Sequence, residues 1–372
     1  MLHLFYILFF IELVFAVCAY TNVAEYAFMP VKERSVSYLS EMRLKLYLVL
    51  SIGVIFFFHA FKNPLTLVDI PEYVDAFYEA KNLSWETIYE IGYESFKTET
   101  GFAFIIKAVS SLFSNDQVLF FLTSAFLLSA VYFAIRRYSP IWWASVFIFM
   151  TDSFPQSLFI LRSFIGIGIF LYAFPSILNR KIVVFLLLCF LASTIHMSAI
   201  IILPVYFLYG IKDWRYLTLS LVITAGILIL GFMVLLPLIV EAVLPEYAYY
   251  MMDVDNSEGI SWKMPALLTA ILLFRLYVMK EHFLEEGINR LLSIIMILAV
   301  TIYVAGLDFG MTSRIAMFYA NMTFLILPNT LQYIKSSSWQ FVCAIAYILL
   351  NSFFFLKSAS DFYWVNYQLL EI

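Results

Sequence analysis

The segment "RKIVVFLLLCFLASTIHMSAIIILPVYFLYG", residues 180–210, decides the fold class. After its first two residues it is almost wholly apolar, and His196 is its only strongly polar side chain. A helix needs about 20 apolar residues to span the hydrocarbon of a bilayer. The apolar run is continuous and does not alternate with polar residues, which favours membrane helices over the strands of a barrel. We therefore predict an all-α integral membrane protein.

The composition of the whole chain supports the same prediction. Its 372 residues are 63% hydrophobic and 13% charged, and the mean hydropathy is +0.92. A water-soluble domain does not bury so large an apolar fraction. No linker rich in glycine, serine or proline interrupts the chain, so we predict one polytopic membrane domain over residues 1–372. No basic patch for nucleic acid and no phosphate-binding glycine motif is present in the sequence.

Apolar segments and basic clusters together predict the topology. The expected crossings lie at about 1–20, 44–61, 117–135, 141–153, 158–178, 182–194, 198–210, 216–240, 264–279, 291–306, 314–333 and 340–357. The apolar stretch 101–114 is short and contains Lys107, so we expect a re-entrant or surface helix there. Cytoplasmic loops of membrane proteins collect lysine and arginine. About 12 crossings with both termini outside place every basic cluster on the cytoplasmic side.

Two long loops, at about 62–100 and 241–263, then face outward. Together they hold 13 acidic and four basic residues, with aromatic residues interleaved. Apolar residues at helical spacing beside acidic residues are typical of amphipathic helices that lie at the membrane interface. We predict such helices in both extracytoplasmic loops.

Three nitrogen-bearing side chains lie near the outer ends of the expected helices: Arg162, His196 and Arg314. Asp69 and Glu99 lie in the adjoining outer loops. Each arginine alone is explained by a side chain that reaches the headgroups, and a lone histidine often serves only in packing. The combination points to a shared site.

The chemistry of these groups suits a lipid-linked phosphate or pyrophosphate. Arginine presents a planar fork of donors that fits phosphate oxygens. Histidine exchanges protons near neutral pH, and we expect neighbouring arginines to favour its neutral form. The apolar tail of such a ligand would remain in the bilayer.

Five short motifs carry a resemblance to a known family. They are "DIPEYVDAF" (69–77), "TETGFAFIIKAVS" (98–110), "SLFILRSFIGIGIF" (157–170), "LASTIHMSAIIILP" (191–204) and "SRIAMFYANMTFLILP" (313–328). In their order and spacing the chain resembles the EpsG-type polysaccharide polymerases, relatives of the bacterial Wzy O-antigen polymerases. Ser163 departs from the common pattern, because many relatives have glutamine after the matching arginine.

The resemblance implies a glycosyltransferase with an all-α membrane fold. We predict that this fold is GT-C-like and that the enzyme uses neither a metal nor a cofactor. It implies polymerisation of undecaprenyl-diphosphate-linked oligosaccharide repeat units at the outer face of the bacterial inner membrane, for O-antigen, capsule or exopolysaccharide. Donor and acceptor are then both lipid-linked glycans, with membrane lipid, chain-length regulators and flippases as further partners. The positions that match the family pattern are Asp69, Glu99, Arg162, His196 and Arg314.

The resemblance also suggests roles for these five residues. Arg162 and Arg314 would bind the pyrophosphate and take part in catalysis, and Glu99 would contribute to substrate binding. His196 or Asp69 would accept the proton of the attacking hydroxyl, and His196 is the preferred base.

Three other functions compete with this interpretation. The tripeptide "DVD" at 253–255 has the carboxylate spacing of a divalent-cation site, which would make the enzyme metal-dependent. A transporter or flippase of a lipid-linked or anionic solute also needs charges within the membrane, but matching repeat halves with interrupted helices are not evident. A membrane acyltransferase needs a histidine too, but its other motifs are not found.

Overall fold

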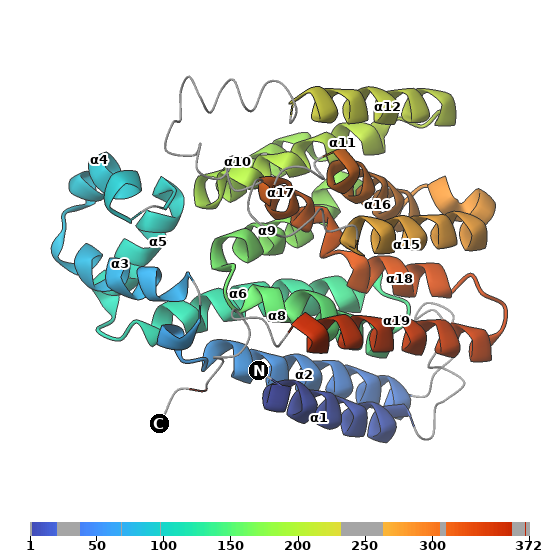
Figure 1. The fold of residues 1–372 in the computed structure, drawn as a ribbon, viewed down its shortest axis with the longest axis horizontal. Helices are drawn as coiled ribbons and strands as arrows, with labels where there is room; N and C mark the ends of the chain where they lie inside the picture. The colour runs from blue at the N-terminus through green and yellow to red at the C-terminus, as the bar shows by residue number, and fades with distance from the viewer. Residues whose placement is uncertain are drawn as a thin grey trace. The chain divides into compact units, whose positions relative to one another are not determined.

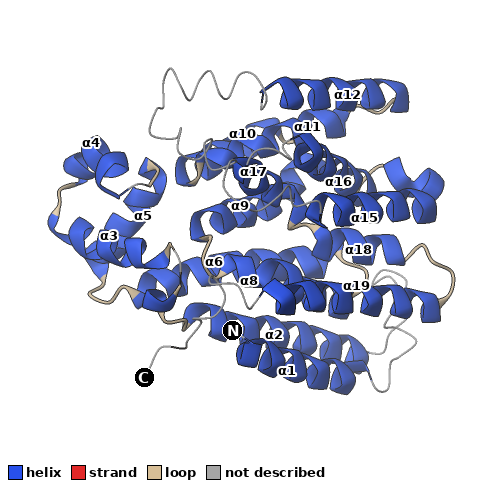
Figure 2. Cartoon of the chain, viewed as in Figure 1, coloured by secondary structure: helices blue, strands red, loops and turns tan. Residues whose placement is uncertain are grey.

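The computed structural model describes residues 2–20, 38–67, 69–96, 98–231, 263–305, 310–358 and 369. Within these ranges the chain is helical and forms no strand (Figure 2), and one isolated antiparallel bridge joins Lys62 to Leu369. The prediction of an all-α fold is confirmed. The chain divides into two compact units, which are described separately below. That both belong to one polytopic domain stays a prediction.

The first unit comprises Met1–Tyr172, Phe190–Met197 and Thr323–Ile372. The elements that lie wholly within it are α1 (Leu2–Tyr20), α2 (Tyr38–Ala60), η3 (Pro64–Thr66), α3 (Ile70–Asn82), α4 (Trp85–Phe96), α5 (Thr100–Leu112), α6 (Gln117–Tyr138), α7 (Trp142–Ile148), the π-helical η4 (Phe149–Ser153), α8 (Phe154–Ser157), α18 (Thr323–Leu331) and α19 (Ser337–Ser358). Helix α2 packs between α1 and α6 (Figure 1). Helix α7 packs against α18. The helices α7, η4 and α8 follow one another without a break, so the helical run that contains the predicted crossing 141–153 continues to Ser157.

The second unit comprises Ala173–Cys189 and Ser198–Met322. Helices α9 (Leu161–Leu178) and α10 (Ile182–Ile195) contribute residues to both units. The element η5 (Met197–Ile202) begins at the last residue of a first-unit segment and continues in the second unit. The elements wholly within the second unit are α11 (Leu203–Gly210), α12 (Trp214–Leu230), α15 (Lys263–Met279), η9 (Lys280–Leu284), α16 (Ile288–Ala305) and α17 (Gly310–Ala320). Helix α16 lies at the centre of this unit and packs against α11, α12, α15 and α17.

Five helices in the described part of the chain are long and apolar enough to cross a membrane. They span Glu41–Ala60, Gln117–Tyr138, Leu161–Leu178, Ile288–Ala305 and Ser337–Phe354. Shorter apolar helices occupy Tyr6–Tyr20, Thr100–Leu112, Ile182–Ile195, Met197–Gly210 and Arg215–Ile227. Every predicted crossing coincides with one or more of the helices described, although residues 232–240 lie outside the described ranges. The membrane character is supported, and the number of twelve crossings stays a prediction.

The predicted loop 62–100 contains the helices α3 and α4, and its place at the outer membrane interface stays a prediction. Helix α3 buries Ile70, Tyr73 and Phe77 at helical spacing and packs against α5, while the ring of Tyr73 meets that of Phe102 edge-on with centroids 5.2 Å apart. Helix α4 also packs against α5. The second predicted loop, 241–263, lies outside the described residues except for Lys263.

Helix α5 has 13 residues, too few to span the hydrocarbon, as predicted for this stretch. Its Lys107 is buried and donates to the carbonyl oxygen of Ala80 at 3.0 Å, near the end of α3. The carbonyls of the last helical turn have no partner within their own helix, and a lysine can bind them. Lys107 therefore ties α5 to the end of α3.

Candidate active site

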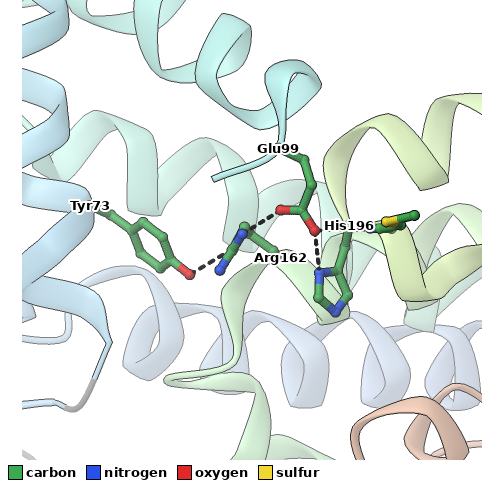
Figure 3. Close-up of polar contacts among 5 residues, drawn as sticks. Tyr73, Glu99, Arg162 and His196 are labelled. Atoms are coloured by element: carbon green, nitrogen blue, oxygen red, sulfur yellow. Dashed lines mark hydrogen bonds and ion pairs between the residues drawn. The ribbon is translucent and has the colours of Figure 1, made fainter. Parts of the chain in front are cut away.

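The structure brings together three of the five predicted site residues, all within the first unit. Glu99 precedes the first residue of α5, Arg162 is the second residue of α9, and His196 follows α10. Their side chains meet together with that of Tyr73 from α3 (Figure 3). Glu99, Arg162 and His196 lie at helix ends, outside the apolar middle of their helices. Tyr73 lies within α3, which packs against α5.

Glu99 links the other groups through its carboxylate. Its Oε2 accepts a hydrogen bond from Nη1 of Arg162. Its Oε1 is 2.9 Å from Nδ1 of His196 and accepts a hydrogen bond, also at 2.9 Å, from the backbone N–H of Met197. The Glu99 side chain is only 19% exposed, so these contacts are largely shielded from water. One carboxylate therefore fixes a cation and an imidazole at the same time.

The environment of Glu99 keeps it ionised. Burial alone raises the pKa of this carboxyl, but the hydrogen bond from His196 and the positive charge of Arg162 outweigh burial and lower the pKa from 4.5 to about 2. A lowered pKa in the folded protein contributes stability above pH 4.5, and this contribution is lost as the pH falls through about 2.

The titration of Glu99 can be measured directly. In infrared difference spectra of the wild-type protein against Glu99→Gln, we expect the protonated carboxyl band of Glu99 to stay absent at about pH 4 and to appear only as the pH approaches 2. A band that titrates near 4.5, the ordinary value, would show that Arg162 and His196 do not hold the carboxylate.

Arg162 is held by two partners through two of its three nitrogen atoms. Its Nε donates to the hydroxyl oxygen of Tyr73 at 3.0 Å, and its Nη1 donates to Glu99. Its Nη2 makes no hydrogen bond to any residue that the structure describes, and the side chain is 23% exposed. Burial raises the pKa of Tyr73, so its phenol stays protonated and has a proton to donate. Arg162 and Tyr73 thus offer donors side by side.

His196 is oriented by Glu99. Because an ionised carboxylate only accepts hydrogen bonds, Nδ1 carries the proton, and the lone pair of the neutral ring is on Nε2. Nε2 points away from Glu99 (Figure 3). The carboxylate also lies between Arg162 and His196, so it offsets the repulsion that we expected between them. A base oriented by a carboxylate is an arrangement suited to proton transfer.

Gly101 allows α5 to approach the end of α10 closely. A Cβ atom at this position would lie 2.5 Å from Oγ1 of Thr194 and 2.6 Å from its carbonyl oxygen. Thr194 is two residues before His196, and Gly101 is two residues after Glu99. The absence of a side chain at Gly101 therefore lets the carboxylate reach the imidazole.

Replacing Gly101 with alanine is expected to separate these two helix ends. We expect the free energy of unfolding to fall by about 1–3 kcal/mol, as for other overpacked sites, and any activity that depends on the Glu99–His196 contact to fall more than tenfold. Gly53 is the matched control, because an added Cβ meets nothing within 4 Å there. Gly53→Ala should keep full activity and leave stability unchanged or raised by up to about 1 kcal/mol. Equal behaviour of the two variants in denaturation and activity assays would contradict the account.

The structure also describes the other two predicted residues, Asp69 and Arg314. Asp69 is exposed and precedes α3 with a φ of 63°, one helical turn before Tyr73, and it makes no hydrogen bond to Arg162 or His196. Arg314 is an exposed residue of α17 in the second unit. Their participation in the site stays a prediction.

Tyr73 and Gly101 were not identified from the sequence, although both lie within quoted motifs. Tyr73 is in "DIPEYVDAF", four residues after Asp69, and Gly101 is in "TETGFAFIIKAVS", two residues after Glu99. Among the described residues, no group of three or more histidine, cysteine, aspartate or glutamate side chains is arranged to hold a metal ion. The tripeptide at 253–255 lies outside the described residues.

Comparison with protein families agrees with the resemblance seen in the motifs. Residues 45–369 match the model of the EpsG family. The chain belongs to the EpsG family. All five predicted site residues fall within the matched EpsG region. Searches of curated proteins and of solved structures found no significant match. EpsG membership together with the apolar helices indicates a membrane protein of polysaccharide polymerisation.

Proposed function

We propose that the chain is a membrane glycosyltransferase that polymerises undecaprenyl-diphosphate-linked oligosaccharide repeat units. The observation that carries this proposal is the carboxylate of Glu99, which Arg162 and His196 share. Transfer of a glycan from a diphosphate needs a cation for the leaving group and a base for the attacking hydroxyl. The shared carboxylate supports both functions in one site. The product is an O-antigen, a capsule or an exopolysaccharide.

Arg162 binds the donor diphosphate in this proposal. Its Nη2 is directed to a phosphate oxygen, while Nε and Nη1 remain with Tyr73 and Glu99. The hydroxyl group of Tyr73 donates a hydrogen bond to the same diphosphate. Donors fixed before the reaction stabilise the negative charge that develops on the leaving group, because they need not reorganise.

His196 is the proposed general base. Its Nε2 takes the proton of the acceptor hydroxyl as the hydroxyl oxygen bonds to the anomeric carbon of the donor. The bond from that carbon to the diphosphate oxygen breaks, and its electron pair stays on the diphosphate. The imidazolium that results is stabilised by Glu99 through Nδ1. Glu99 therefore orients the base and the cation, a role that adds to the substrate binding predicted for it.

Two further residues complete the proposed machinery. Arg314 is the second cation for the pyrophosphate, and Asp69 is the alternative base or a contact to the sugar. Asp69 is exposed on the α3 side of the Tyr73–Arg162 contact, which suits a group that meets a ligand arriving from water.

The proposal also includes the topology and partners that the sequence predicts. Twelve crossings with both termini outside place the site at the extracytoplasmic face of the bacterial inner membrane. Donor and acceptor glycans reach it on their lipid carriers from within the bilayer. Chain-length regulators and flippases are the proposed protein partners.

Purified protein in detergent is expected to convert lipid-linked repeat units into polymer and to release undecaprenyl diphosphate. Activity in excess EDTA should stay within about twofold of the untreated value, because Arg162 supplies the positive charge that a metal would otherwise provide. Activity abolished by EDTA and restored by a divalent cation would contradict metal independence. A transporter would yield no polymer in this assay, which has no second compartment.

A further inference from the structure

A buried lysine outside the site contacts the chain turn that leads into Arg162. Lys62 follows α2 and has no exposed surface. Its Nζ donates to the carbonyl oxygen of Leu158 at 2.7 Å and lies 5.7 Å from the centre of the Phe120 ring. No carboxylate among the described residues is within ion-pair distance of Nζ. An ammonium group buried without a carboxylate is costly, so this contact needs an explanation.

The backbone of the turn provides that explanation. Between α8 and α9, the carbonyl of Gln156 accepts hydrogen bonds from the N–H groups of Phe159 and Ile160, and the carbonyl of Phe159 accepts from Leu161. The carbonyls of Ser157 and Leu158 accept no backbone hydrogen bond within the described chain. Carbonyl groups at a buried helix end need partners from elsewhere.

Both of these carbonyls find their partner at the end of α2. Nε2 of His59 lies 3.1 Å from the carbonyl oxygen of Ser157 and from its Oγ, and Nδ1 of the same ring lies 2.7 Å from Oγ of Ser124. Lys62, three residues later, binds the next carbonyl, that of Leu158. Two side chains from one segment thus hold two successive carbonyls of the turn.

We propose that Lys62 is a positioning residue for Arg162, which it places by fixing the carbonyl of Leu158, four residues earlier in the turn that leads into α9. This inference rests on the proposed role of Arg162 in binding the diphosphate. Burial lowers the pKa of Lys62 to about 7, and both the charged and the neutral amine donate to a carbonyl. Within the described chain, the Lys62 side chain contacts none of the residues of the Glu99 cluster, so its effect on the reaction passes through the turn.

Hydrogen exchange tests this role without reference to activity. In Lys62→Met, which keeps an unbranched side chain of similar length but removes the donor, backbone amides of residues 158–164 should exchange at least tenfold faster. Lys107→Met is the matched control, because Lys107 is another buried lysine that binds a helix-end carbonyl, that of Ala80. It should leave residues 158–164 unchanged. Unchanged exchange at 158–164 in Lys62→Met would overturn the inference.

Activity measurements then separate positioning from general stability. Lys62→Met should lower polymer formation at least tenfold, and Lys62→Gln, which keeps a donor, should restore it to within about threefold of wild type. In an Arg162→Lys background, Lys62→Met should lower the remaining activity less than twofold, because the group it positions is already altered. If Lys62→Met lowered activity by the same factor in the Arg162→Lys background as in the wild-type protein, the inference would be overturned. If Lys62→Met does not fold, Lys62→Gln is compared with Lys107→Gln in the same exchange experiment. Lys62→Gln should then raise the exchange rates of residues 158–164 by less than tenfold, and Lys107→Gln should leave them unchanged.

The two proposals fail in different ways. Full activity of Arg162→Ala would refute the proposed function, while the exchange rates at 158–164 still decide whether Lys62 holds the turn.

Discussion

Replacing Glu99 with glutamine is expected to lower polymer formation by about 10²- to 10³-fold, within the range found for lost general-base or oxyanion contacts. The amide of glutamine has no negative charge, so the guanidinium of Arg162 and the imidazole of His196 lose the anion that both contact. The amide nitrogen of the new glutamine is itself a donor, so the side chain can no longer accept hydrogen bonds from Arg162, His196 and Met197 together, as the carboxylate does. The measurement is the initial rate of polymer formation from lipid-linked repeat units.

Two controls separate this effect from the loss of any acidic residue. Glu86→Gln makes the same change at an exposed carboxylate of α4 and should keep activity within about twofold of wild type, as for most surface substitutions. Glu99→Asp keeps the charge on a shorter side chain and should retain more activity than Glu99→Gln. Wild-type activity in Glu99→Gln would mean that the carboxylate has no part in the reaction.

Replacing Arg162 is the second change with a large expected effect. Arg162→Ala should lower activity by about 10³-fold, because the diphosphate loses the donor that stabilises its developing charge. Arg162→Lys keeps the charge but not the fork, and one ammonium group cannot serve Tyr73, Glu99 and a phosphate oxygen in the same geometry. We expect a loss of about 10²-fold for the lysine variant, measured in the same assay.

The matched control for Arg162 is Arg136, an exposed arginine in the last turn of α6. Arg136→Ala should leave activity within about twofold of wild type. If Arg162→Lys were as active as wild type, the positive charge alone would suffice, and the fork geometry described for Arg162 would have no role.

The helices were predictable where the signal is local. The predicted crossing 182–194 corresponds to α10, Ile182–Ile195, because an apolar run that ends at a polar histidine is visible in the sequence itself. The helical run that contains the predicted crossing 141–153 continues beyond residue 153 to Ser157. Pro155 does not end the helical run, since it lies in the first turn of α8, directly after the π-helical segment, where a missing N–H is tolerated.

The site was predictable in part. Charged and imidazole groups within apolar segments are rare, and this rarity identified Arg162 and His196. Glu99 was identified by its place in the adjoining outer loop and by the family resemblance. The structure brings these three side chains together. Tyr73, Gly101 and Lys62 carry no comparable signal, because their importance arises from contacts with residues distant in sequence. Arg162 is 89 residues from Tyr73, and Leu158 is 96 residues from Lys62. Such contacts depend on how the helices pack, which a single sequence does not specify.

The most direct test of the central claim, that Glu99, Arg162 and His196 act as one assembly, is a double-mutant cycle. Polymer formation is measured for Glu99→Gln, for His196→Gln and for the two changes combined. If the carboxylate acts by orienting His196 and Arg162, the double variant should be no more than about threefold slower than the slower single variant. If instead the two losses multiply, the carboxylate and the imidazole act independently, and the shared assembly is contradicted.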